Sequence, residues 1–159
     1  TGVDLWAVPT SGPPDPIPLV VTPASEFEAQ VSPDGRWLAY ASDESGIWEV
    51  YVQAFPGGGG KVAVSTGGGS EPQWRRDGRE LYYLSADVTL QAVEILPGPQ
   101  LQIKRPVALF RAPVPVSELN ARRNHYTVSA DGQRFLMNAG DTAEESVAVV
   151  VGWNRALGR

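Results

Sequence analysis

An apolar run follows each of three Asp-Gly steps, and this arrangement of hydrophobic and polar positions recurs along most of the chain. The three copies occupy residues 31–40, 74–83 and 128–137. Each copy begins on an apolar residue, continues through a polar Asp-Gly segment, and ends with three consecutive apolar residues. A strand with one face in water alternates apolar and polar residues, whereas a strand buried on both faces does not. The pattern therefore predicts strands that are covered on both sides by other sheets.

The polar segment of each copy has the residues of a hairpin turn. In the first copy, Pro33 fixes φ for the second turn position, Asp34 suits the third, and Gly35 adopts the left-handed conformation. Turns of this kind join neighbouring antiparallel strands. The Asp-Gly steps begin at positions 34, 77 and 131, which are 43 and 54 residues apart. A period of about 40–45 residues is typical of the four-stranded blade of a β-propeller.

The remaining apolar segments complete a strand map around these hairpins. Leu5–Val8 resembles 50–53 and so has the character of a third strand, and Ile17–Val21 is a candidate fourth strand. We expect further strands near 27–31, 36–42, 47–53, 61–65, 72–74, 79–85, 89–95, 107–110, 124–128, 133–138 and 147–153. No segment has a sustained 3.6-residue apolar period, so the predicted fold class is all-β.

We interpret the chain as one partial β-propeller domain of about three antiparallel blades over residues 1–159. Its predicted parts are the strands of an incomplete blade in 1–22, blades in 25–66 and 70–111, a loop insertion in 112–123, and a three-stranded blade in 124–153. Propellers close on themselves with four to eight blades. An open arc would expose about 300 Å² of sheet at each end, from the spacing of strands and residues. Burying two such faces is worth on the order of 15 kcal/mol.

We therefore expect the chain to bind a second copy of itself and form a six-bladed ring. In this hypothesis Ile17–Val21 of one chain completes the three-stranded last blade of the other, and Leu5–Val8 is left as a spare strand. Exchanging a strand in this way would also cover an open sheet edge. An unidentified protein or small ligand is a further possible partner.

Composition excludes several classes of protein. The net charge is −5, so the chain is unsuited to nucleic acid, and we read the basic pairs 75–76 and 122–123 as solvated turn residues. The longest apolar stretch, 147–153, is too short to span a bilayer, so we expect no membrane insertion. The chain has no cysteine and thus no thiolate metal site. It opens on Thr1 without a signal peptide, which suggests a segment of a longer or processed protein.

Candidate catalytic groups are sparse, and we assign no catalytic, cofactor-binding or metal-binding residue. The single histidine, His125, stands in a first-strand position, which would line a propeller channel; we favour a partly exposed residue at the strand entry. One histidine without cysteine excludes a structural zinc site, which needs four nitrogen or sulfur ligands. No Gly-x-Ser-x-Gly segment is present. We read Asp34, Asp77 and Asp131 as turn residues, and the acidic residues at 43–44, 141 and 144–145 as facing water.

Three other segments have plain structural interpretations. The glycine runs 57–60 and 67–69 lack the Lys-Ser/Thr ending of a phosphate-binding loop, and we interpret them as blade connections. Trp37, Trp74 and Trp153 fall in core strand positions. The irregular segment 112–124 is long enough to be a contact loop, although a variable solvent-filling loop is the more ordinary interpretation.

The segment 30–40, reading Gln-Val-Ser-Pro-Asp-Gly-Arg-Trp-Leu-Ala-Tyr, resembles the repeats of TolB-type β-propellers. Together with 42–46, 49–52, 65–69 and 72–83, it is similar to the C-terminal propeller of many bacterial serine/threonine protein kinases. The resemblance covers about 25–153. It implies a non-catalytic sensor or protein-interaction module, periplasmic or otherwise outside the cytoplasm, linked to a kinase. The sequence contains neither the kinase nor a membrane span.

Two classes of function follow as hypotheses. The first is a non-catalytic module that binds a protein or a ligand and takes part in signalling. The second is the propeller part of a hydrolase such as a prolyl-peptidase-like enzyme, for which His125 would be the residue to test. A gene fragment that folds without a selected function is a third alternative.

Overall fold

The structure is a computed structural model that describes residues 2–114, 116, 124–138 and 147–151. Within these ranges there are fourteen β-strands and no α-helix, so the predicted all-β class is confirmed. None of the described segments is a helix that could cross a membrane.

The strands form four antiparallel groups. The N-terminal hairpin consists of β1 (Leu5–Ala7) and β2 (Ile17–Val20). Blade 1 consists of β3 (Glu26–Val31), β4 (Trp37–Ser42), β5 (Glu49–Ala54) and β6 (Val62–Ala63). Blade 2 consists of β7 (Gly69–Trp74), β8 (Glu80–Ser85), β9 (Thr89–Leu96), β10 (Gln102–Ile103) and β11 (Val107–Arg111). Blade 3 consists of β12 (Tyr126–Val128), β13 (Arg134–Asn138) and β14 (Val147–Val151).

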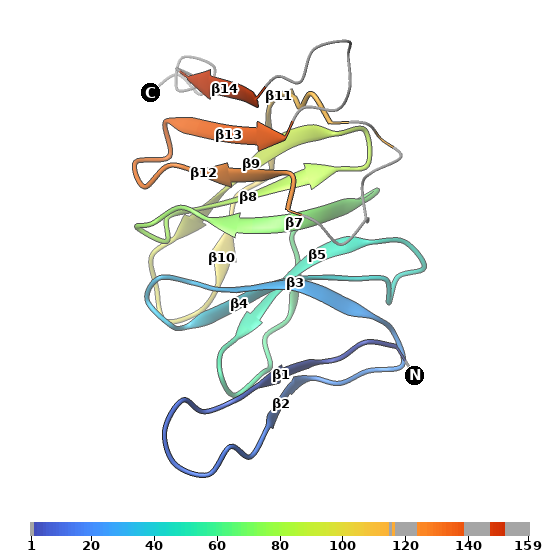
Figure 1. Ribbon diagram of the computed structural model, residues 1–159, viewed down its shortest axis with the longest axis vertical. Helices are drawn as coiled ribbons and strands as arrows, with labels where there is room; N and C mark the ends of the chain where they lie inside the picture. The colour runs from blue at the N-terminus through green and yellow to red at the C-terminus, as the bar shows by residue number, and fades with distance from the viewer. Residues whose placement is uncertain (1, 115, 117–123, 139–146, 152–159) are drawn as a thin grey trace.

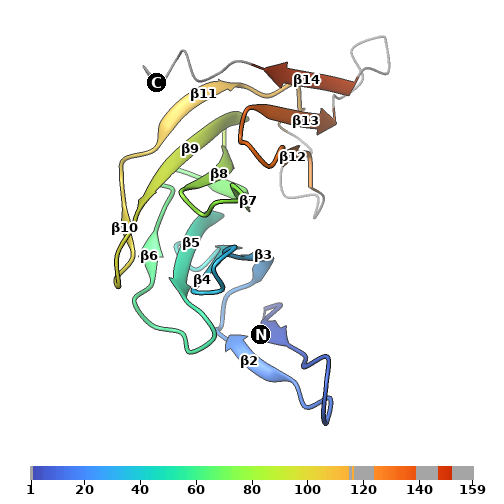
Figure 2. The ribbon, with the colours of Figure 1, turned by 90° about the vertical axis from the view of Figure 1, so that its left-hand side faces the viewer.

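The groups are stacked in chain order along a curved arc (Figures 1 and 2). The first strand of each blade, β3, β7 or β12, lies on the concave side of the arc, and the outer strands β6, β10 and β11 lie on the convex side (Figure 2). Each blade runs outward from its first strand by antiparallel pairing with the next. This arrangement is that of a partial β-propeller, as the repeat predicts.

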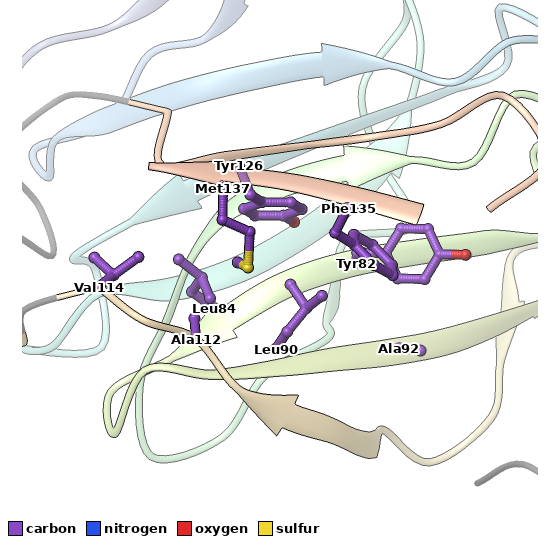
Figure 3. Close-up of a cluster of buried hydrophobic side chains, with 9 residues drawn as sticks. All are labelled: Tyr82, Leu84, Leu90, Ala92, Ala112, Val114, Tyr126, Phe135 and Met137. Atoms are coloured by element: carbon purple, nitrogen blue, oxygen red, sulfur yellow. The ribbon is translucent and has the colours of Figure 1, made fainter. Parts of the chain in front are cut away.

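Two hydrophobic cores hold the blades together. The core between blades 1 and 2 includes Ala39 and Val52 from one side and Trp74 and Leu81 from the other. The core between blades 2 and 3 is centred on Phe135, whose ring meets Tyr82 edge-on at 5.0 Å (Figure 3). A third cluster packs the N-terminal hairpin on blade 1. Each core thus joins consecutive groups of the chain.

The second strands of blades 1 and 2 are buried along almost their whole length, as their unbroken apolar runs predict. In β4 the five residues after Trp37 are buried, and in β8 all residues but Ser85 are buried. The strand β13 differs, since buried Phe135 and Met137 alternate with exposed neighbours. The exposed face of β13 points away from blade 2, where no further blade follows among the described residues.

The structure corrects two details of the sequence interpretation. The strand β9 is long enough for two partners, so β10 pairs with its end at 95–96 while β11, the expected fourth strand, pairs with 89–92. The segment 112–124 is not simply a solvent-filling loop, because Ala112 and Val114 are buried in the core between blades 2 and 3. Its middle, with 122–123, lies outside the described residues, as do Trp153, Asp141 and the acidic residues at 144–145.

The N-terminal hairpin has the position of the third and fourth strands of an incomplete blade. The Glu26 N–H donates to the Val3 carbonyl at 2.7 Å, just before β1. The Gly69 N–H, 43 residues later, donates to the Trp48 carbonyl at 2.8 Å, just before β5. Since β5 is the third strand of blade 1, the matching contact assigns β1 to the third-strand position that the sequence indicates.

Candidate functional site

Three first-strand residues at one repeat position lie side by side on the concave side of the arc. Glu28, Glu71 and His125 each stand six residues before the Asp of an Asp-Gly step. The sequence interpretation considered only His125 and missed the two glutamates. The signal was available, because the three residues have the same 43- and 54-residue spacing as the turns.

Each glutamate side chain binds the backbone of the next blade. A Glu28 carboxylate oxygen accepts a hydrogen bond from the Glu71 N–H at 2.6 Å. A Glu71 carboxylate oxygen accepts one from the His125 N–H, also at 2.6 Å. Bulges in β3 and β7 interrupt the ladder here, and Glu28 and Glu71 adopt φ values of 58° and 55°. The bulge re-aims a side chain out of its own sheet. The result is a chain of contacts that runs from blade to blade.

The last link is a buried acid–imidazole pair. The second oxygen of Glu71 contacts Nδ1 of His125, and the two side chains are only 1% and 2% exposed. The expectation of a partly exposed histidine at the strand entry is therefore wrong, because β7 and its bulged glutamate cover the ring. The Tyr126 hydroxyl donates to the Glu71 carbonyl at 2.8 Å, and burial raises the pKa of this phenol well above its usual value.

The first link, from Glu28 to the Glu71 N–H, is less buried. Burial raises the pKa of Glu28 to about 7, and the nearby negative charge of Glu71 adds to this effect. The hydrogen bond from the Glu71 N–H and the charge of His125 oppose it. Glu28 therefore changes charge near neutral pH while it remains the acceptor for blade 2.

A cleft opens at the rim where blade 1 meets blade 2. Its apolar part, about 380 Å³, is lined by 46–48, 67–70, Leu84 and Ala86. An adjoining part of about 330 Å³ shares Gly67, Gly68 and Ala86 and continues to Asp87 and Arg105. We call the two parts together the rim cleft. Its walls are loops held by rigid sheets, which is where propellers and other scaffolds carry binding residues.

The glycine run 67–69 forms one wall of the rim cleft and is tied to a carboxylate. Glu49 accepts hydrogen bonds from the N–H groups of Gly67 at 2.7 Å and Gly68 at 3.0 Å. The Ser65 hydroxyl contacts the other Glu49 oxygen. Burial, with the charge of Glu49, raises the pKa of Tyr83 in this wall to about 12. These amides are occupied by Glu49, in accordance with a structural blade connection rather than a phosphate loop.

The repeated aspartates do cap their own turns. The carboxylates of Asp34, Asp77 and Asp131 accept the backbone N–H two residues on, at 3.1, 3.0 and 3.0 Å. The described residues contain no group of three or more His, Asp or Glu side chains arranged to hold a metal ion.

Two charged segments only partly meet the expectation that they face water. Glu44 and Arg76 are exposed as expected, and Glu44 pairs with Lys61 at the surface at 2.6 Å. Asp43 is half-buried and accepts a hydrogen bond from the Ser25 N–H at 2.8 Å. Arg75 is also half-buried; it contacts Asp77 and pairs with buried Glu80 at 3.0 Å.

Comparison with known proteins identifies the fold and no family. The sequence matches no protein-family model and no curated protein. TolB from Acinetobacter baumannii is similar in structure with a TM-score of 0.59 and 12% identity over 89% of this chain. The chain spans only 33% of that protein's length. An oligogalacturonate lyase from Vibrio parahaemolyticus aligns with a TM-score of 0.47 and 15% identity, over 85% of this chain and 36% of the lyase. The similarity to TolB confirms the TolB-like propeller fold.

Proposed function

We propose that the chain is a non-catalytic β-propeller module that binds an extended peptide segment of a partner protein in the rim cleft. This proposal rests on the change from apolar to charged lining residues along the rim cleft. One part is lined by Ile47, Trp48 and Leu84, and the adjoining part reaches Asp87 and Arg105. An apolar peptide side chain suits the first part, and polar or charged groups suit the second.

The cleft walls are well prepared for such a ligand. The Trp48 ring packs against Phe27 with a centroid distance of 5.3 Å, so the aromatic wall is fixed before binding. Glu49 holds the opposite glycine wall through two amide hydrogen bonds. Walls that are already ordered reduce the entropy lost on binding.

A peptide-display selection against the intact chain tests the proposal. We expect selected peptides to share an apolar residue followed by polar or charged residues. Ala86→Trp places a large ring in both parts of the cleft and should weaken binding at least tenfold. The matched control is Ala130→Trp, which also changes an exposed turn alanine but lies in the β12–β13 turn. Peptides that bind the two variants equally well would contradict the proposal.

A link to signalling kinases is a finer part of the same proposal. It is supported by the resemblance of segments such as 72–83 to kinase-linked propellers. In that setting the module would sense or recruit a protein outside the cytoplasm. Reading the gene upstream of Thr1 tests it, since we expect a kinase and a membrane span in the same frame. A different domain in frame there would contradict this part alone.

The alternative is the propeller part of a hydrolase, favoured only by the Glu71–His125 pair. An imidazole beside a carboxylate is a common general base. The pair's burial and its hydrogen bonds between blades support a structural role instead. An activity screen of wild type and His125→Gln separates the two, since loss of a detected hydrolysis in a folded variant would favour the enzyme.

A further inference from the structure

The first strands of blades 1 and 2 have the same repeat position but very different surroundings. In β7 every residue except Gln73 is buried. In β3 the last three residues are exposed, and Val31 keeps 45% of its surface in contact with solvent. The difference arises because β7 is followed by β12 and preceded by blade 1, whereas among the described residues no first strand of another blade precedes β3. The concave end of blade 1 is therefore an open position for another blade.

Blade 3 has the opposite open face. Leu136 is 49% exposed, on the face of β13 that points away from blade 2. Its repeat equivalents, Ala39 and Tyr82, are buried in the cores that join each blade to the next. Leu136 thus stands at a position that in both other blades packs against a following blade.

At each junction between blades, one repeat position in the second strand of a blade packs with one repeat position in the first strand of the next blade. At the junction of blades 1 and 2, Ala39 shares a core with Trp74. At the junction of blades 2 and 3, Tyr82 shares a core with Val128. Val31 is the repeat equivalent of Trp74 and Val128. By the same pairing of positions, Leu136 would pack against the Val31 position of a following blade. Another copy of the arc can supply that residue.

We propose that a second copy of this chain closes the arc, so that blade 3 of each copy packs on blade 1 of the other around a two-fold axis. Leu136 of one chain then meets Val31 of its partner at both junctions. Many exposed apolar residues of the described chain lie at its N-terminal end, which supports this arrangement, whereas Ile47, Val107 and Val116 are exposed elsewhere. The N-terminal set is Val3, Trp6, Val8, Ile17, Val21 and Val31. Four sheet faces of about 300 Å² each reach the roughly 1,200 Å² of a small specific interface.

Charge at the two ends is also complementary. Residues 1–22 contain Asp4 and Asp15 and no basic residue. The open face of β13 presents Arg134 to solvent. Opposite charges at the rim of an interface favour the correct orientation of the partners.

The N-terminal hairpin defines how the shared blade is built. The strand β2 pairs with β1 of its own chain, so it joins as part of a hairpin and not as the single exchanged strand that the sequence suggests. Because β1 has the third-strand position, it matches the same edge of β13 that β14 occupies within one chain. In the ring the hairpin of the other chain therefore displaces β14 from this edge, and the shared blade consists of β12–β13 of one chain with β1–β2 of the other. With two complete blades from each chain and two shared blades, the ring has six blades in all.

Light scattering over a concentration series tests the ring with the full 159-residue chain. We expect twice the 17.1 kDa mass of one chain, constant across the series. Leu136→Asp should return the mass to that of one chain. Val107→Asp, a charge at a similarly exposed apolar residue on the convex side, should leave it doubled. A folded wild type with the mass of one chain overturns the proposal, and so does a mass that rises steadily with concentration, which indicates open filaments.

Cysteine cross-linking tests the contact itself, because the chain has no native cysteine. We expect an equimolar mixture of Val31→Cys and Leu136→Cys chains to form a disulfide-linked dimer under mild oxidation. Either variant alone should remain largely unlinked, since each residue faces the other and not itself. Equal linking of the mixture and of the single variants overturns the proposed pairing. Neither experiment depends on the rim cleft or its ligand.

Discussion

The junction between blades 1 and 2 and the junction between blades 2 and 3 fill the same repeat positions with different side chains. At the first junction the half-buried Glu28 carboxylate receives the Glu71 N–H. At the second, fully buried Glu71 receives the His125 N–H and also contacts the ring. The backbone link is the same in both, whereas burial and charge differ. Repeat position therefore determines the geometry of a link, and the residue identities determine its strength and pH response.

The largest expected effect is on the apolar part of the second junction. Phe135→Ala removes a ring with no exposed surface that meets Tyr82 at 5.0 Å. We expect the free energy of unfolding to fall by about 3–5 kcal/mol, the usual cost of deleting a buried aromatic ring. Urea unfolding followed by circular dichroism measures it. A loss under 1 kcal/mol would mean that this core does not hold blade 3.

The next largest effect is expected at the carboxylate contacts between blades, where Glu71 and Glu28 can be compared directly. Glu71→Ala leaves the buried His125 N–H without its acceptor, which costs about 1–3 kcal/mol for such a group. Glu28→Ala should cost less, because water can reach the half-buried site. The φ angles are 55° at Glu71 and 58° at Glu28, so the backbone contribution is matched. Equal losses in urea unfolding would contradict the difference between the links.

The pH response of the first link gives a smaller effect. The folded pKa of Glu28, about 7, lies above its ordinary value of 4.5. Its contribution to stability is therefore complete below pH 4.5 and is lost as the pH rises through 7. Wild type should lose stability relative to Glu28→Gln between pH 5 and pH 8. Chemical unfolding of both proteins across this range measures it, and a pH-independent difference would contradict the raised pKa.

The smallest effect concerns the turn of blade 2. Blades 1 and 3 have Ser32 and Ser129 hydrogen-bonded to the turn aspartate, where blade 2 has Arg75. The contact with Arg75 lowers the pKa of Asp77 to about 2. In Arg75→Ser we expect this pKa to rise toward the ordinary 3.8. An NMR titration of the carboxyl carbon measures it, with Asp131 as the internal control that should not move.

Much of the fold could be predicted from the sequence because it is local. The Asp-Gly turns and the apolar runs after them define hairpins within about ten residues, and the structure has strands at these places. The burial of both strand faces also follows from the unbroken apolar runs in β4 and β8. It does not in β13, after which no further blade follows among the described residues. Local pattern and repeat spacing together were sufficient for the architecture.

The carboxylate contacts between the first strands could not be predicted in the same way, because the residues that they join are distant in sequence. Glu28 and Glu71 lie 43 residues apart, and Glu71 and His125 lie 54 apart. Nothing near Glu71 in sequence indicates a bulge that turns its carboxylate toward another sheet. The same reason applies to Ala112 and Val114, whose burial depends on Met137 and its neighbours in blade 3. Comparing equivalent repeat positions would have found the glutamates.

The carboxylates of Glu28 and Glu71 both bind the blade that follows their own along the chain. Since translation proceeds from the N-terminus, Glu28 is synthesised before β7, and Glu71 is synthesised before the segment that contains His125. Blades 2 and 3 thus each find a carboxylate acceptor for one backbone N–H already in place on the preceding blade. The arc is consequently suited to vectorial, blade-by-blade growth during synthesis.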